Sequence, residues 1–464
     1  MIQPHPSSYR DPDARVYRGP GHRILRCLGP DASARLAHFR RNGLLDQLTE
    51  RGLFVETWVP LDVAPPKGWR AIVESRAVRP VSYPYEWCFG MLQDTALLTL
   101  RLSRALLPHG AILRDASAYN VLFDGHRPVF VDVGSLGLRA EGQAWAGYGQ
   151  FCDHFLAPLL LEAVKGVPFQ PLLRSNMEGI PASTLASLLG AVACLRHGVL
   201  AHVHLRAWLE RRARTLHLDE RQRVGEVRIP SGALEGQLAR LERVVGRLHS
   251  RAHTVWASYE KKAYDDPATA TKDAFVSQAC DRVKRWGTAW DVGANTGRHS
   301  RILAKRVATV VAMDADPGAV DVLYRSLKAD PPPARVLPLV VDVANPSPGQ
   351  GWRGAERSDL DSRSRPDFAI YLALLHHLCL GRGLPLSEVA DWIAETSELA
   401  VIEFVSADDP MSRLLMATRP SPHEGYDELS FRRLFQARGR IVDEQRLSPT
   451  RLLVLFASSV RRFA

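Results

Sequence analysis

The sequence lacks the features that mark membrane, secreted and disulfide-rich proteins. No stretch approaches the roughly 18 consecutive apolar residues that a membrane-spanning helix needs, and the polar, proline-rich N-terminus has no apolar core of a secretory signal. The six cysteines are widely scattered and form no Cys-x-x-Cys pair, so we expect neither a disulfide framework nor a zinc ribbon. These absences predict a cytoplasmic protein with no membrane segment.

The chain also lacks a concentrated basic segment, although its net charge is +10. A positive charge of this size can attract an anionic partner such as nucleic acid. However, the arginines are spread along the chain, and no run of five or six basic residues occurs. We therefore do not expect nucleic acid to be the main partner. A single hydrophobic core rarely extends over 464 residues, so the length predicts two or three domains.

Local patterns divide the chain into three segments. Residues 1–150 mix strand-like and helical runs and predict an α+β domain, and the mainly helical residues 151–262 complete it. A boundary near residues 264–268 precedes the last segment, 263–464. The elements expected in the first segment are strands over 23–28, 53–59 and 71–78, a helix over 31–52 with Asp31 as its N-cap, a helix over 91–107, and a hairpin over 120–134 whose loop exceeds two residues.

Strands and helices alternate in the C-terminal segment. This alternation predicts a parallel sheet covered by helices, a doubly wound α/β fold. The expected strands lie at 289–292, 309–313, 337–341, 367–372 and 399–405, and the expected helices at 297–305, 317–328 and 385–396.

A glycine-containing loop follows the first of these strands. The strand ends at Asp291, and Gly293, Asn295 and Gly297 open the next helix. Glycine lets the backbone turn tightly and approach a ligand closely, as in dinucleotide-binding domains. The signature G-x-G-x-x-G is not matched, because Asn295 stands at the second glycine. By itself the loop leaves nicotinamide dinucleotide binding open.

Two acids at the ends of the next strands narrow the interpretation. Asp314 follows the loop by about 20 residues, where a carboxylate can bind both ribose hydroxyls. Asp342 ends the third strand. Loop and acids together resemble class I S-adenosyl-L-methionine (SAM) dependent methyltransferases. The resemblance implies that Asp314 holds the ribose, that Asp342 meets the adenine, and that four residues line the methionine side, namely Asp291, Gly293, Asn295 and Gly297.

The resemblance extends over nearly the whole chain. Segments 81–87, 148–158, 345–352, 373–378 and 401–405 are similar to a bacterial group whose members are described as SAM-dependent methyltransferases or as similar to the nodulation protein NoeA. Because the chemistry of this group is assigned through its SAM motifs, the resemblance implies a cofactor and no particular methyl acceptor.

His376 and His377 are the candidate catalytic residues. They follow the fourth strand, and the carboxyl ends of strands face the ligand crevice in open α/β sheets. A histidine there could take a proton from a hydroxyl or amine acceptor. The alternative is that one of them caps the strand and packs locally. A base is not always needed, because many methyl transfers require only that the acceptor is aligned with the methyl group. Glu403, at the end of the fifth strand, is a weaker candidate.

A second set of polar residues resembles the catalytic loop of protein kinases. Asp115 and Asn120 stand five apart, and Asp132 begins an Asp-Val-Gly turn after the expected hairpin. In kinases such residues orient the acceptor hydroxyl and hold magnesium on the phosphates, so the resemblance implies a Mg-ATP site. No lysine lies in the strand before the first helix, where Arg23 or Arg26 would have to serve. The alternative is a loop–hairpin–loop whose polar residues cap turns.

The sequence thus predicts SAM-dependent methyl transfer to an unidentified acceptor, with a small metabolite or glycan precursor favoured. A phosphotransferase, or an ATP-binding regulatory protein that uses the kinase-like region, is the alternative. The expected architecture is a Rossmann-like methyltransferase domain preceded by an α+β, degenerate kinase-like domain with a helical extension. The sequence makes no prediction of the oligomeric state.

Overall fold

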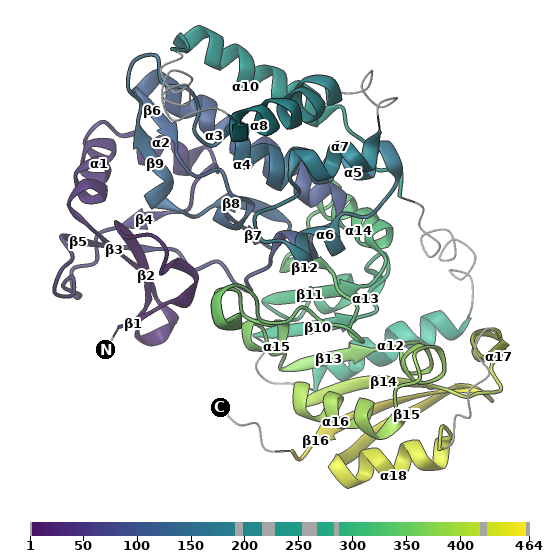
Figure 1. Cartoon of the computed structure of the whole chain (residues 1–464). Helices are drawn as coiled ribbons and strands as arrows, with labels where there is room; N and C mark the ends of the chain where they lie inside the picture. Colours follow the sequence, from purple (N-terminus) through teal and green to yellow (C-terminus); the bar gives the residue numbers. More distant parts are fainter. Residues whose placement is uncertain are drawn as a thin grey trace. The chain divides into compact units, whose positions relative to one another are not determined.

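The protein is described by a computed structural model over residues 2–190, 198–215, 228–252, 267–282, 287–417 and 425–460. The chain divides into two compact units (Figure 1). The first unit comprises 1–253 and 348–358, and the second comprises 254–347 and 359–464. The predicted boundary near residue 263 lies outside the described residues. Among those that are described, no helix is both long and apolar enough to span a membrane.

The first unit begins with a five-stranded antiparallel sheet. Its strand order is β1-β2-β3-β5-β4. The bounds are β1 Gln3–Pro4, β2 Ala14–Arg18, β3 Ile24–Leu28, β4 Thr57–Trp58 and β5 Ala71–Ser75. The strand predicted over 53–59 is reduced to β4, because Phe54 instead bridges to Phe130.

The helix predicted over 31–52 is in fact two helices, α1 (Pro30–Arg41) and α2 (Leu44–Glu50). Gly43 separates them with a left-handed φ of 70°, a conformation that interrupts a right-handed helix. The prediction of Asp31 as N-cap is wrong: Gly29 occupies that position and Asp31 lies in the first turn, where its charge favours the helix N-terminus.

The rest of the first unit combines short antiparallel pairs with helices. β6 (Ala111–Leu113) pairs with β9 (Leu136–Leu138), and β7 (Val121–Asp124) forms a hairpin with β8 (Arg127–Phe130). The predicted hairpin is confirmed, but its loop is only two residues long, because Asp124 pairs with Arg127. Gly125 has the positive φ, 65°, that such a turn requires.

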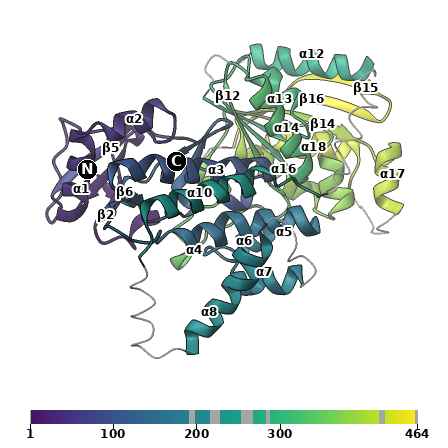
Figure 2. The same ribbon diagram turned by 90° about the horizontal axis from the view of Figure 1, so that it is seen from above.

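Helices complete the first unit, and the two longest of those that the structure describes lie side by side. α3 (Phe89–Leu106) lies beside α10 (Ser231–Gly246) (Figure 2). The side chain of Gln93 donates to the carbonyl of Val245 at 2.8 Å. The apolar stripe of α10 is buried, as its three- and four-residue spacing predicts. The shorter helices are α4 Tyr148–Phe151, α5 Ala157–Lys165, α6 Gln170–Ser175, α7 Ala182–Leu189 and α8 Arg206–Thr215.

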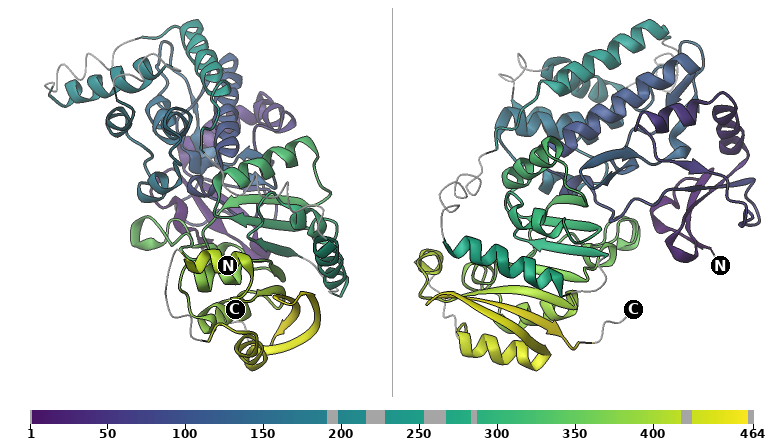
Figure 3. Two further views of the ribbon diagram at one scale, coloured as in Figure 1. Left: turned by 90° about the vertical axis from the view of Figure 1, so that its right-hand side faces the viewer. Right: turned by 180° about the vertical axis from the view of Figure 1, so that it is seen from behind.

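The second unit contains a seven-stranded sheet of order β12-β11-β10-β13-β14-β16-β15 (Figure 3). Its first five strands are parallel, as predicted, whereas β16 runs antiparallel to β14 and to β15. The bounds are β10 Thr288–Val292, β11 Thr309–Asp314, β12 Arg335–Val340, β13 Phe368–Tyr371, β14 Leu399–Val405, β15 Gly439–Ser448 and β16 Arg451–Ser458. The Rossmann-like fold predicted for this region is confirmed.

Helices cover both faces of this sheet, because side chains alternate between the faces along each strand. Ile370 packs with α12, α13 and α14, while the neighbouring Tyr371 contacts Trp392 of α16. Phe404 contacts Phe431 of α18 on the same side as α16. The bounds are α12 Pro267–Asp281, α13 Arg298–Leu303, α14 Pro317–Ala329, α15 Leu360–Arg363, α16 Leu386–Thr396, α17 Pro410–Ala417 and α18 Glu428–Arg438.

Candidate functional site

A cavity of about 930 Å³ opens in the second unit at the carboxyl ends of its parallel strands. Ligands of open α/β sheets bind in this position. Its lining comes from the ends of β10, β11, β12 and β13 and from residues near β14 and β16. The cavity therefore has a half beside β10–β12, where the resemblance places the cofactor, and a half beside β13, β14 and β16.

The loop after β10 shapes the first half. Gly293, Asn295 and Gly297 all have positive φ, of 80°, 48° and 85°. A Cβ on Gly297 would lie 2.3 Å from Leu323 Cδ1, so only glycine lets the loop pack against α14. Gly293 and Asn295 line the cavity, but Gly297 does not. The prediction that Gly297 lines the methionine side is therefore corrected: Gly297 lets the loop pack against α14.

Asp291, in β10, supports the loop by linking this strand to α13. Its side chain is buried and accepts a hydrogen bond from Ser300 Oγ of α13 at 2.5 Å. Burial raises the pKa of this carboxyl. Asp291 is not among the lining residues, because its position within β10 directs the side chain into the core beside α13. The expectation that Asp291 lines the methionine side is therefore corrected as well: its carboxyl binds Ser300 inside the domain.

Asp314 lies in the cavity wall at the end of β11. Its carboxylate accepts backbone hydrogen bonds from Asn295 at 2.8 Å and from Asp316 at 2.9 Å. Burial raises the pKa of Asp314, and these two hydrogen bonds oppose that effect. The carboxylate is thus fixed at the point where the resemblance places the ribose hydroxyls.

Asp342 lines the same half from the end of β12. Its Oδ2 lies 2.7 Å from Nη2 of Arg382, and its Oδ1 accepts from the backbone N–H of Ala344 at 3.0 Å. Arg382 also lines the cavity and was missed by the sequence analysis, since no local motif marks it. The acid predicted to meet the adenine therefore lies in the cavity with a cation beside it.

His376 and His377 line the second half. His376 is 2% exposed, and burial lowers its pKa to about 3, with smaller contributions from His377 and then Arg451 and Lys272. Burial also lowers the pKa of His377. Nδ1 of His376 has no hydrogen-bond partner among the residues that the structure describes. At neutral pH these imidazoles are uncharged, so a ring nitrogen can accept a hydrogen bond.

An ion cluster that the sequence did not reveal supports this half. Glu403 is completely buried and accepts from Lys272 Nζ at 2.8 Å and from the backbone N–H of Ala373 at 2.9 Å. Arg451 lies 3.4 Å from Glu403 and 2.8 Å from Asp409. Only Glu403 was considered from the sequence. The others come from α12, the β14–α17 connection and β16, which local spacing cannot bring together.

The backbone is strained where this cluster meets the cavity. Ala373 has a φ of 49°, which a residue with a Cβ adopts at a cost of about 1–2 kcal/mol. Its N–H is held by Glu403, and the next residues carry His376 and His377. Strain retained in this way is characteristic of functional loops.

The kinase-like residues of the first unit also come together. Asn120 Nδ2 lies 3.4 Å from the carbonyl oxygen of Asp115 and 3.2 Å from Ser135 Oγ, which donates to the carboxylate of Asp132. The order of sheet, helix, long helix, loop, hairpin and Asp-Val-Gly turn is the one predicted from the kinase resemblance.

The magnesium site expected from that resemblance does not fit the structure. Nη1 of Arg26, on β3, lies 2.6 Å from Oδ1 of Asp132, so a guanidinium stands against the carboxylate that would bind the metal. Arg23 is directed elsewhere and pairs with Asp62 and Glu74. Within the described ranges, no group of three or more His, Cys, Asp or Glu residues could hold a metal ion. These contacts lend no support to Mg-ATP.

Comparison with known proteins finds a relative that matches most of the chain and solved structures that match less than half of it. The nodulation protein NoeA of Rhizobium meliloti (strain 1021) is 32% identical over 453 residues, which cover 94% of this chain and 92% of that protein. The bifunctional kinase-methyltransferase WbdD has 17% identity and a TM-score of 0.32, covering 47% of this chain and 46% of its own. The N-methyltransferase NodS from Bradyrhizobium japonicum WM9 has 12% identity and a TM-score of 0.31, covering 44% and 98%. No protein-family model matches.

Proposed function

The chain belongs to the family of the nodulation protein NoeA, and from this premise we propose that it transfers a methyl group from SAM to a small metabolite or glycan precursor. The observation that carries the proposal is the cavity of the second unit, in which Gly293, Asn295, Asp314 and Asp342 share one wall.

The residues of this wall fit SAM. Asp314 presents a carboxylate to the ribose hydroxyls, and charge-assisted hydrogen bonds of this kind contribute about 1.5–3 kcal/mol. Oδ1 of Asn295 is buried and has no hydrogen-bond partner among the described residues, so it can accept from the ammonium group of the methionine end. When bound, SAM supplies a methyl group on a positively charged sulfur.

The second half of the cavity would hold the acceptor. Leu374, Met411 and Leu447 give it apolar walls that exclude water, and His376 offers an uncharged imidazole. The loop from Ala373 to His377 would align the acceptor with the methyl group, and such alignment alone removes much of the barrier to transfer. We propose that His377 accepts the proton that a hydroxyl or amine acceptor loses. His376 is less suited to this role, because a pKa of about 3 makes it a weak base at neutral pH.

We do not extend the proposal to phosphoryl transfer. That reaction depends on metal ions and cations that neutralise the phosphates, whereas Asp132 is bound by Arg26. The first unit is better suited to present the acceptor than to phosphorylate it.

The proposal is tested by incubating the full chain with SAM labelled in its methyl group and with fractionated cell extract. We expect label in a low-molecular-weight or glycan fraction, and about tenfold less label with Asp314→Ala at a SAM concentration below saturation. Asp330→Ala is the control, because the side chain of Asp330 is 87% exposed in the same unit and, within the described part of the chain, forms an ion pair only with Arg301. Label that stays equal in wild type and Asp314→Ala, or that enters only protein or RNA, contradicts the proposal.

A further inference from the structure

Three arginines of the first unit have no carboxylate partner within the part of the chain that the structure describes. They are Arg18, Arg79 and Arg357. Arg18 Nη2 lies 2.8 Å from His5 Nε2, and the other two donate to backbone carbonyls, Arg79 to His22 at 3.3 Å and Arg357 to Ser7 at 3.4 Å. A guanidinium is always charged, and it usually meets a carboxylate or phosphate. These three positive charges are uncompensated.

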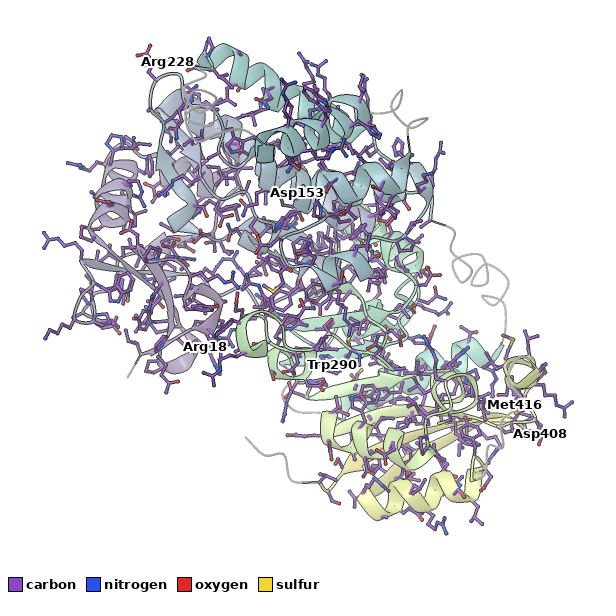
Figure 4. The ribbon with its side chains drawn as sticks, in the orientation of Figure 1. Arg18, Asp153, Arg228, Trp290, Asp408 and Met416 are labelled. Carbon is purple, nitrogen blue, oxygen red and sulfur yellow. The ribbon has the colours of Figure 1, made fainter. Side chains whose placement is uncertain are left out.

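The three arginines surround one residue, His5. Burial lowers the pKa of His5 to about 4, and Arg18, Arg357 and Arg79 contribute to this shift in that order. Arg18 also lowers the pKa of Arg79. The contacts place the arginines together. Arg18 contacts His5, and Arg357 contacts Ser7, two residues further along the chain. Arg79 contacts His22 in the β2–β3 turn, at the end of the strands where Arg18 pairs with Ile24. Figure 4 labels Arg18, which is the last residue of β2. The three arginines therefore face a common region.

The hydrogen bonds of His5 leave most donors of Arg18 unused. Nδ1 of His5 lies 2.7 Å from the hydroxyl oxygen of Ser7, and Nε2 lies 2.8 Å from Nη2 of Arg18. A neutral imidazole carries one proton. With this proton on Nδ1 and directed at the Ser7 hydroxyl, Nε2 accepts one hydrogen bond from Arg18. A guanidinium has five N–H donors, and His5 is the acceptor that the structure gives Arg18 among the described residues. An anion beside Arg18 would accept the remaining donors.

We propose that Arg18, Arg79 and Arg357 form a binding site for a phosphate group. A guanidinium binds a phosphate through two parallel hydrogen bonds. A phosphate monoester carries a charge of about −1.5 to −2 at pH 7, which matches three uncompensated cations better than a single carboxylate does. The guanidinium carbon of Arg357 also lies 4.4 Å from the centre of the Tyr119 ring. In the sequence, Tyr119 lies between Asp115 and Asn120. The phosphate therefore lies close to the kinase-like loop, in a site that does not depend on the proposed methyl transfer.

The site is tested by calorimetry with inorganic phosphate on the full chain, in the presence of S-adenosylhomocysteine to fill the cavity of the second unit. We expect saturable binding of one phosphate, weakened about tenfold or more in Arg18→Gln and in Arg79→Gln. Both side chains are exposed and lack carboxylate partners, so neither substitution leaves a buried charge unpaired. Arg101→Gln is the matched control, because it removes the same charge from an arginine that Glu242 neutralises.

Equal phosphate affinity in wild type and in both variants overturns the site, as does acetate that binds as tightly as phosphate at equal ionic strength. Two further ligands identify the source of the phosphate. Tighter binding of glucose 6-phosphate than of a short single-stranded oligonucleotide supports a small phosphorylated ligand. The opposite order contradicts that assignment. A thermal melt of each variant confirms that it is folded.

Discussion

The completely buried carboxylate of Glu403 lies 2.8 Å from the ammonium nitrogen of Lys272, and so joins strand β14 to α12. Removing one partner of a buried ion pair leaves the other charge poorly compensated, and Glu403 would keep only Arg451 at 3.4 Å as a charged partner among the described residues. We expect Lys272→Met to lower the free energy of unfolding by about 2–4 kcal/mol. Lys305→Met, on the surface of the same unit, should change it by less than about 0.5 kcal/mol. Denaturant unfolding of the two variants measures the difference, and equal losses would contradict it.

Asp314 should dominate the affinity for the cofactor. Asp314→Ala removes the carboxylate that is fixed by Asn295 and Asp316, and we expect S-adenosylhomocysteine to bind about tenfold more weakly or worse. Isothermal titration calorimetry measures the loss, with Asp330→Ala as the surface control. An unchanged affinity in Asp314→Ala would remove the ribose assignment.

Gly297 should tolerate no side chain. Gly297→Ala meets both a left-handed φ of 85° and Leu323 Cδ1 at 2.3 Å, so we expect a loss of about 2–4 kcal/mol in stability. Gly383→Ala has a similar φ of 75° but nothing within 4 Å of the added Cβ, and should cost only about 1 kcal/mol. Thermal unfolding compares the two. If they lose the same stability, the contact with Leu323 is unimportant.

His376 should make the protein less stable in acid. Its pKa of about 3 in the folded protein lies below the ordinary histidine pKa of 6.5, so between these values the unfolded chain binds more protons than the folded one. Stability therefore rises with pH in this window and is lost as the pH falls. We expect His376→Gln to reduce the slope by about 1 kcal/mol per pH unit between pH 6 and 4. Denaturant unfolding as a function of pH tests this, with the exposed His22→Gln as control.

His5 should report on the arginines around it. Its pKa of about 4 reflects burial first and then Arg18, Arg357 and Arg79. Arg79→Gln should raise this pKa, although not to the ordinary value, because burial remains. An NMR titration of the His5 ring measures the shift, and Arg101→Gln should leave it in place. A pKa that does not move in Arg79→Gln would show that the arginine acts on His5 too weakly to share a site with it.

Much of the second unit could be predicted from the sequence, because its signals are local. A strand followed by Gly293 and Gly297, with acids at the ends of the next two strands, specifies a βαβ arrangement within short stretches of chain. The five parallel strands follow from this alternation. The antiparallel pair β15 and β16 does not, because a strand carries no mark of the direction in which its neighbour runs.

The tertiary structure alone decided which polar groups meet. Asp291 and Gly297 belong to the cofactor motif, yet one packs under α13 and the other against α14, since the direction of a side chain depends on the neighbouring elements. Lys272 and Arg451 stand 131 and 48 residues from Glu403 and share no motif with it. Arg26 shows the same limit. From the sequence it was a candidate to replace the missing lysine of kinases. Its ion pair with Asp132 forms only because β3 packs against the Asp-Val-Gly turn. Sequence patterns determine secondary structure through nearest neighbours, whereas charge pairing depends on distances that arise only when remote segments pack.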